Sequence, residues 1–532
     1  MFSSSLLWLG SQVAQSRDIL SVRPRNWALI GVMTVIVVLA ATLRVVDVTE
    51  NPPGFFTDEA AVGHNAHTIL TSGKDEYGTR FPLLFRSFGD YKLGVGVYAT
   101  VPFVAVFGKT EFAVRLTGVV LGLTAILAIY FLTTAIFESR QIGVISALVL
   151  AILPWHIHYS RTGFTEMLSF LPLLIFGLYA FVRGVDKKEW LLAGGVLLGL
   201  TLHTYRAAWL VVPPLVILLV ILYRRELITN QRTSLYAFAI LVMMTLPIVA
   251  HLSSGAGDRA QEAGLLRLSL TGWEKIGLFA EQYWSYFSYS FLVSNGDNGL
   301  ITRHYLPGFG HLYAIQIPLM LVGILGLLLK PTRKKIIVLA LVVLFPLGGA
   351  LSDTSPISSR SIVGLVPVSL ITSYGLVLLI YTINKLGRPY SRLMTGIFIT
   401  LALGITLGSL VHYVRNYHES YPSVAADYWG WQEGPQEIVE YFRDSSGDYD
   451  QLVMDGEFNG PHMFFQFYAH ERCRDGGCIT GNLESYRPDK KQLFALKPRH
   501  YSGNYEYRTV HEIRYPSGEV AFLLREVINV TK

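Results

Sequence analysis

Long apolar runs recur along the first three quarters of the chain, separated by short polar segments. Most runs are roughly 20 residues long, the length that an α-helix needs to cross the hydrocarbon core of a bilayer. The pattern therefore predicts a polytopic α-helical membrane protein with about eleven or twelve spans. Spans whose limits are clear are predicted near residues 27–48, 165–183, 190–205, 208–223, 234–252, 311–330, 336–350, 362–383 and 393–412.

Basic residues in the short connections predict the topology. Arg23 and Arg25 precede the first span, so this span should begin in the cytoplasm. Three apolar blocks then follow between two points that are both predicted to lie outside, and an odd number of crossings conflicts with that placement. We therefore expect one of the two shorter blocks, 93–107 or 142–155, to be re-entrant, broken or parallel to the membrane surface.

The end of the chain is more polar than the rest. Residues 1–412 are predicted to form the membrane domain, and 413–532 a small extracytoplasmic α/β domain. Within it we expect helices near 433–443 and 461–470, a strand near 451–455, and a hairpin of strands at 507–515 and 519–527. The chain has two cysteines, Cys473 and Cys478, and an oxidising location would favour a local disulfide between them.

The composition supports a membrane protein and argues against nucleic-acid binding. Only 15% of the residues are charged, compared with about 25% in soluble domains. The formal net charge of +6 arises from Lys and Arg residues that sit mainly in short loops between apolar runs, where they set topology.

Two adjacent acids stand in the first outside loop, residues 49–92. Placing an ionisable side chain at the edge of a bilayer costs free energy, so such residues usually have a function. Asp58 and Glu59 are therefore candidate catalytic acids. An alternative is that they begin a juxtamembrane helix, since Thr57 or Asp58 is a good N-cap and acids suit a first turn. Glu166 is a possible second catalytic acid, although its place at the start of a span explains it equally well.

Cationic and polar side chains are predicted on the same outer face. Lys92, with its neighbour Tyr91, is placed to bind an anionic substrate group at headgroup height, and Arg206 and Arg360 stand near the outer ends of spans. For each cation, ordinary interfacial anchoring is the alternative. His304 precedes a Pro-Gly turn that suits a binding loop.

A metal site is not predicted from the histidines. His156 and His158 are two residues apart, which does not place them on one helix face, and no nearby Cys or paired acid completes a tetrahedral set.

This gathering of polar residues at one face suits an enzyme that acts on a lipid-linked polar group. A transporter or flippase of lipid-linked sugars would more typically show acids within spans or broken helices at the midplane. A receptor or scaffold would leave the acid pair without a role. Sugar transfer from a lipid phosphate needs a carboxylate base, cations for the departing phosphate, and exclusion of water.

Several ordered segments resemble one family of membrane enzymes. They are the acid pair after the first span, Asp90-Tyr-Lys92, FGKTEFAVR at 107–115, PWHIHYSR at 154–161, HTYRA at 203–207, RHYLPG at 303–308 and SSR at 358–360. In order and spacing they resemble the GT-C glycosyltransferases, and most closely the bacterial protein O-mannosyltransferase and lipid A aminoarabinose transferase group. The likeness covers about 1–412.

The resemblance implies an inverting transfer from a polyprenyl-phosphate sugar to a lipid, glycan or protein acceptor at the outer face of the cytoplasmic membrane. It implies that Asp58 is the catalytic acid and that Lys92 binds the donor phosphate, whereas Glu166 stands where many members carry Asp. Some relatives need a divalent metal and others do not, so a metal stays open. A ligase-like enzyme with a diphosphate donor is the nearest alternative, but it would more typically carry paired arginines in loop 253–310.

Overall fold

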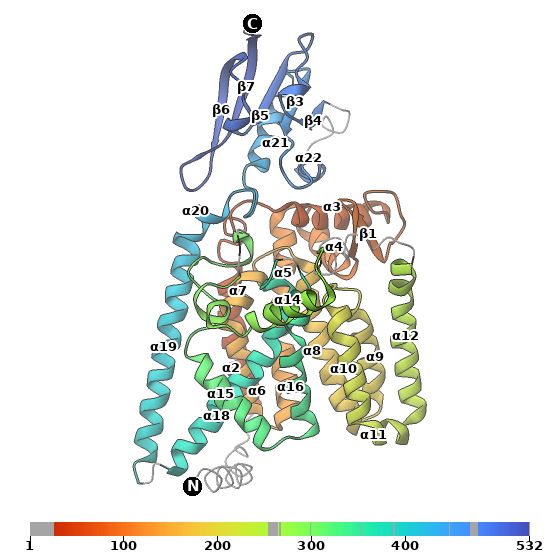
Figure 1. Cartoon of the computed structure of the whole chain (residues 1–532), viewed down its shortest axis with the longest axis vertical. Helices are drawn as coiled ribbons and strands as arrows, with labels where there is room; N and C mark the ends of the chain where they lie inside the picture. The colour runs from red at the N-terminus through yellow and green to blue at the C-terminus, as the bar shows by residue number, and fades with distance from the viewer. Residues whose placement is uncertain are drawn as a thin grey trace.

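The protein is an α-helical bundle that carries a small α/β domain at one end, as the computed structural model shows (Figure 1). The structure describes residues 26–253, 264, 268–297, 299, 301–352, 354–386, 389–445, 447–468 and 477–530. Arg23 and Arg25, on which the predicted orientation depends, lie outside these residues. The helices of the bundle are α2 (Asn26–Val45), α5 (Glu111–Phe137), α6 (Arg140–Ile152), α8 (Thr165–Asp186), α9 (Glu189–Thr201), α10 (Ala208–Leu222), α12 (Gln231–Ser253), α15 (Gln316–Leu329), α16 (Arg333–Leu344), α18 (Leu365–Leu386) and α19 (Ser391–Glu419).

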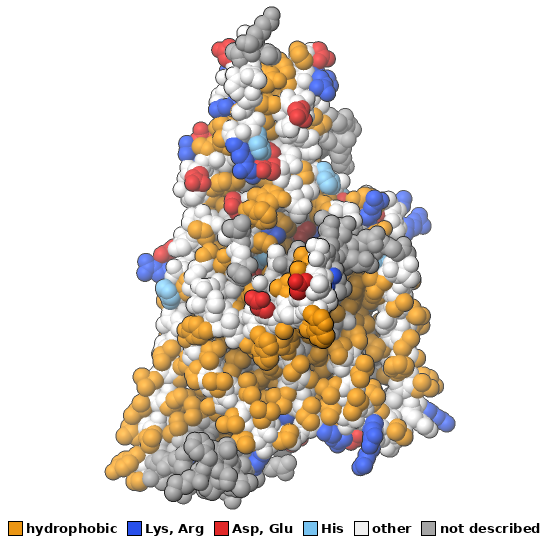
Figure 2. All heavy atoms as spheres, viewed as in Figure 1, with side chains coloured by type: hydrophobic (Ala, Val, Ile, Leu, Met, Phe, Trp, Pro, Cys, Tyr) orange, Lys and Arg blue, Asp and Glu red, His pale blue; other side chains and the backbone are white. Residues whose placement is uncertain are grey.

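These helices confirm the predicted polytopic membrane class. Among the described residues, six helices are long and apolar enough to cross a bilayer, and a bent helix pair makes a seventh. Shorter apolar helices, including α9, α10 and α15, run beside them (Figure 1). Hydrophobic side chains cover most of the bundle surface, and many of the charged side chains lie at its lower end or on the upper domain (Figure 2). The total of eleven or twelve crossings stays a prediction, because it depends on the shorter helices.

The conflict between the first loop and Glu166 has a structural explanation. Helix α4 (Val95–Phe107) begins where the Val95 amide donates to the His203 carbonyl, and just past its other end Lys109 Nζ donates to the Gln466 carbonyl at 2.7 Å. Both ends of α4 therefore lie on the side of the α/β domain, so this block does not cross the bundle. Helix α6 is also broken, because it bends by 61° into α7 (Pro154–Ser160).

The α/β domain is built on a five-stranded sheet of order β4-β3-β5-β7-β6. Strands β4 (Cys478–Gly481), β3 (Gln451–Asp455) and β5 (Gln492–Leu496) are parallel, and β7 (Val520–Val530) and β6 (Tyr505–Arg514) complete the sheet in antiparallel fashion. The strand expected near 451–455, the hairpin and the two helices, α21 (Pro435–Asp444) and α22 (His462–Tyr468), are present. Strands β4 and β5 were not predicted. Cys473 lies outside the described residues, so its pairing with Cys478 stays a prediction.

The α/β domain packs on α3 (Thr57–Ser72), a helix within the first loop that lies across the end of the bundle (Figure 1). The rings of Phe55 and Phe467 are 4.9 Å apart. A Cβ atom at Gly63 would lie 2.5 Å from the Phe467 ring, so glycine is what lets α22 approach α3 this closely. The first loop is thus enclosed between the bundle and the domain.

Candidate active site

Asp58 and Glu59 occupy the first turn of α3, but their side chains have opposite environments. The helix begins after the extended Phe56, whose backbone N–H donates to Glu59 Oε2 at 3.0 Å. This bond supplies half of a capping box. The Glu59 side chain is fully buried, whereas that of Asp58 is 39% exposed. Two neighbouring carboxylates therefore have different chemistry available to them.

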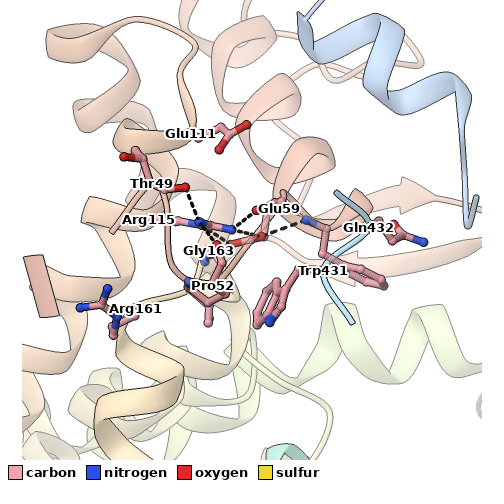
Figure 3. A network of polar contacts seen from close by, with 12 residues as sticks. Thr49, Pro52, Glu59, Glu111, Arg115, Arg161, Gly163, Trp431 and Gln432 are labelled. Atoms are coloured by element: carbon pink, nitrogen blue, oxygen red, sulfur yellow. Dashed lines mark hydrogen bonds and ion pairs between the residues drawn. The ribbon is translucent and has the colours of Figure 1, made fainter. Parts of the chain in front are cut away.

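Glu59 is held in a buried ion pair (Figure 3). Its carboxylate accepts from Arg115 Nε and Nη2, both at 3.2 Å, and from the Gly163 amide at 2.6 Å. Arg115, also fully buried, donates in addition to the carbonyls of Val48, Thr49, Pro52 and Gly54.

This network fixes the first loop in place. Each oxygen of Glu59 already accepts hydrogen bonds, so its geometry fits the positioning of the loop and of α3 rather than proton transfer. Arg161 acts in the same way, because its guanidinium donates to the carbonyls of Leu43, Asp47 and Asn51. The arginines that end segments 107–115 and 154–161 therefore both anchor the start of the first loop.

Asp58 faces Lys92 across the loop. Lys92 Nζ donates to Asp58 Oδ1 at 2.9 Å, and the lysine side chain is 17% exposed. Lys92 lies in β2 (Asp90–Leu93), which pairs with β1 (Leu84–Ser87) in an antiparallel hairpin. Burial alone would lower the pKa of Lys92, but the charges of Asp58 and Glu166 outweigh burial and raise it. Lys92 therefore stays protonated at neutral pH.

The hairpin also brings Arg206 to the site. Arg206 Nη2 contacts Asp90 Oδ1 at 2.5 Å and donates to the Tyr91 carbonyl at 3.0 Å. Glu166 lies in the first turn of α8, close enough to Lys92 to influence its charge. The structure thus gathers Asp58, Lys92, Glu166 and Arg206, whereas the side chain of Tyr91 points to a contact with His251, 4.7 Å between rings.

His304 and Arg360 lie on the neighbouring loops. Tyr159 links their segments, because its hydroxyl is 3.3 Å from His304 Nδ1 and 2.7 Å from Ser358 Oγ. Burial first, then the charge of Arg303, lowers the pKa of His304 well below its usual range, so this imidazole is neutral. Arg360 donates to the Ser352 hydroxyl.

Two arginines that the sequence reasoning did not assign prove central to this region. Arg115 stands five residues into a helix that is otherwise apolar, and an ionisable residue in such a segment is itself a signal of a special role. Arg303 lies 4.2 Å from the centre of the Phe56 ring and donates to the Trp429 carbonyl at 2.9 Å. Burial lowers the pKa of Arg303, and the nearby Asp58 carboxylate partly offsets this effect.

One group of acids and histidine in the described part of the chain has the spacing of a metal site. Only Asp455, Glu457 and His500 bring ligand atoms within 4.8 Å of one another there. Glu457 already pairs with Arg499 and, at 3.0 Å, with Lys497, and the Arg499 hydrogen bond lowers its pKa to about 2. The group is an ion-pair network at the edge of the sheet and does not fit a metal. At the first loop, Asp58 is paired with Lys92 and Glu59 with Arg115.

A half-buried acid at the joint between the two domains predicts a pH-dependent stability. Burial first, and then the carboxylates of Glu437, Glu111 and Glu50, raises the pKa of Glu433 from 4.5 to about 7. Because the folded state holds this proton more tightly than the unfolded state, stability falls as the pH rises from about 4.5 to 7, and the loss is complete above that range. We expect Glu433→Gln to unfold at a higher temperature than wild type at pH 8 and at a similar temperature near pH 4.5.

Thermal unfolding in detergent across this pH range measures the effect. The exposed Glu506→Gln is the matched control and should follow wild type. A constant difference between Glu433→Gln and wild type at every pH would contradict the assignment.

Comparison with known proteins agrees with this architecture. Residues 95–251 match the family model of dolichyl-phosphate-mannose-protein mannosyltransferase. The structure of ArnT from Cupriavidus metallidurans bound to undecaprenyl phosphate is similar with a TM-score of 0.53 and 12% identity, over 94% of this chain and 97% of that chain. Comparison with curated protein sequences finds no match.

Archaeal oligosaccharyltransferases share the same fold. AglB from Archaeoglobus fulgidus, in complex with an inhibitory peptide and a dolichol-phosphate, has a TM-score of 0.55 and 12% identity, over 86% of this chain and 64% of that chain. The Archaeoglobus fulgidus oligosaccharyltransferase in complex with Zn and sulfate has a TM-score of 0.54 and 13% identity, over 92% and 72%. The family-model match over residues 95–251 and the fold shared with ArnT and AglB agree with the predicted resemblance to the GT-C glycosyltransferases.

Proposed function

We propose that this protein transfers a sugar from a polyprenyl-phosphate donor to an acceptor hydroxyl at the outer face of the cytoplasmic membrane. The observation that carries the proposal is the contact between Asp58 and Lys92, 2.9 Å, in the first loop. It joins a partly exposed carboxylate to a cation, the two groups that such a transfer requires. ArnT bound to undecaprenyl phosphate and AglB with a dolichol-phosphate support this donor class.

In the proposed reaction Asp58 is the general base. The acceptor oxygen bonds to the anomeric carbon from the face opposite the phosphate, and its proton passes to the Asp58 carboxylate. The bond between the anomeric carbon and the phosphate oxygen breaks, and the lipid phosphate departs with the electron pair. The configuration at the anomeric carbon is therefore inverted.

Lys92 holds the departing phosphate in this scheme. In the free protein Lys92 is paired with Asp58, so donor phosphate would compete for the same ammonium group and release the carboxylate for catalysis. Arg206 and Arg303 supply further positive charge from neighbouring segments, and Glu166, Tyr91, His304 and Arg360 belong to the surrounding substrate-binding residues in this proposal. The buried Glu59 positions the loop.

The α/β domain is proposed to lie outside the membrane and to bound the acceptor side of the site. Its loop between β3 and α22 touches α3 next to Asp58, where Thr57 Oγ1 donates to the Gly460 carbonyl at 3.3 Å. Phe88 of the hairpin that carries Lys92 contacts His462, with ring centres 5.9 Å apart. An acceptor that reaches Asp58 from this side would meet residues 456–462.

Sugar transfer by the purified protein tests the proposal. The full chain in detergent is given a panel of polyprenyl-phosphate sugars, and transfer to added acceptors and hydrolysis to free sugar are both measured. Turnover of at least one donor, with inversion at the anomeric carbon, is the expected result. Binding of polyprenyl-phosphate sugars without turnover under every acceptor condition would favour a carrier of lipid-linked sugars, and turnover of diphosphate donors alone would favour a ligase-like enzyme.

Replacing Lys92 should weaken donor binding. A charge-assisted hydrogen bond to phosphate contributes about 1.5–3 kcal/mol, so Lys92→Ala should bind a polyprenyl-phosphate sugar about 10- to 100-fold more weakly. Lys74→Ala is the matched control, because Lys74 is an exposed lysine of the same loop. Equal donor affinity in both variants would remove Lys92 from the phosphate site.

A further inference from the structure

A second site lies at the opposite end of the bundle from Asp58. An apolar groove of about 800 Å³ opens between α9, α10 and α12, and it is closed at one end by α11 (Arg224–Thr229). Its walls are almost entirely aliphatic or aromatic, and examples are Leu198 of α9, Leu219 of α10 and Leu235 of α12. The volume falls in the range of about 300–1,000 Å³ that small-molecule sites occupy.

The groove exists because α12 is attached to the bundle along one side. Gly195 and Gly199 of α9 let α12 approach closely: a Cβ at Gly195 would lie 2.5 Å from the Ala237 carbonyl oxygen, and one at Gly199 would clash with the side chain of Met244. The rest of α12 is exposed, and the helix stands at the edge of the bundle (Figure 1). The space between α10 and α12 is thus left open to a lipid.

Two arginines stand at the closed end of this apolar groove. Arg224 and Arg232 line it, and both are exposed. Within the described part of the chain neither takes part in an ion pair or side-chain hydrogen bond, whereas the neighbouring Glu226 is paired with Arg333 at 2.6 Å. The groove therefore combines apolar walls with two positive charges at one end. The walls suit acyl chains, and the charges suit an anionic headgroup.

The topology indicates which lipid leaflet this end faces. Arg224, Arg225 and Arg232 cluster in the short connection between α10 and α12, and such clusters lie on the cytoplasmic side. Basic pockets between transmembrane helices on that side bind the headgroups of anionic lipids. We propose that the α9–α12 groove binds an anionic glycerophospholipid of the cytoplasmic leaflet, with its acyl chains between α10 and α12 and its phosphate at Arg224 and Arg232.

Lipid binding to the delipidated full-length protein tests this proposal by native mass spectrometry. Phosphatidylglycerol and phosphatidylcholine with identical acyl chains are compared on wild type and on the double variant Arg224→Gln/Arg232→Gln. Two basic side chains near the surface predict that the double variant binds phosphatidylglycerol about 10- to 30-fold more weakly, with phosphatidylcholine unchanged. Arg225→Gln/Arg392→Gln is the matched control, since it removes two exposed arginines that do not line the groove.

A second variant tests the apolar part of the site. Val220→Trp places a bulky side chain at a position that lines the groove and keeps both arginines, so it should reduce binding of both phospholipids. Equal phosphatidylglycerol binding in wild type and in both groove variants would overturn the proposal. The proposal would also be overturned if Arg224→Gln/Arg232→Gln bound undecaprenyl phosphate more weakly but phosphatidylglycerol as tightly as wild type. The groove would then hold a polyprenyl carrier.

Discussion

Asp58→Asn should lower sugar transfer by about 100- to 10,000-fold, the range that a positioned general base contributes. Asparagine keeps the size of the side chain but has no carboxylate to accept the acceptor's proton. Donor binding should persist or become tighter, because Lys92 would lose the partner that it contacts at 2.9 Å and would be free for phosphate. In this variant we therefore expect turnover to fall while donor affinity stays the same or rises.

The measurement compares initial rates of transfer with donor affinity in the same preparation. Asp47→Asn is the matched control: Asp47 is also an acid beside the first loop, and its exposed side chain lies 3.6 Å from His418, away from Lys92. The control should retain wild-type turnover. Full activity of Asp58→Asn would exclude Asp58 as the base, and Glu166, the other acid near Lys92, would then be tested by the same assay.

Glu59→Ala should destabilise the protein by about 3–5 kcal/mol, because it leaves the buried Arg115 without its charge partner. Arg115 would keep its bonds to loop carbonyls but would lose both carboxylate contacts. Glu59→Gln should cost less, since its one amide oxygen still accepts from either the Phe56 or the Gly163 amide, although not from both, because these two donate to different oxygens of Glu59. A catalytic role for Glu59 predicts instead a stable protein with low activity.

Thermal unfolding and the yield of folded protein in detergent distinguish these outcomes. The control is Glu419→Ala, which breaks the ion pair between Glu419 and Arg415. The side chains of this pair are 61% and 70% exposed, respectively. An exposed pair contributes little, so this variant should unfold close to wild type. If Glu59→Ala unfolds like the control, the buried pair does not hold the first loop.

Most of the secondary structure could be predicted from the sequence. The predicted span near 165–183 corresponds to α8, and the predicted hairpin corresponds to β6 and β7. The length of an apolar run and the alternation of apolar and polar residues in a strand are both properties of a short sequence window, so the sequence alone reveals them. The short strand β4, at Cys478–Gly481, was missed because four partly buried residues carry little periodic signal.

Whether α4 crosses the bundle could not be predicted from the sequence. Its 13 residues are apolar, with the composition of a span, and length alone left it ambiguous. Contacts with His203 at one end and Gln466 beyond the other place both ends on one side of the bundle. These partners are far away in sequence, so no local pattern encodes the outcome.

The sequence by itself determined that this is a polytopic membrane protein. It also predicted that the candidate catalytic acids and the candidate binding cations lie at one face, and it singled out Asp58 and Glu59 as the acids to test. Only the tertiary structure separated the two acids. Glu59 is buried by Arg115, 56 residues away, and by Gly163, 104 residues away, while Asp58 meets Lys92 of a hairpin. Adjacent residues on a helix point in different directions, and what each one meets is set by segments that folding brings together.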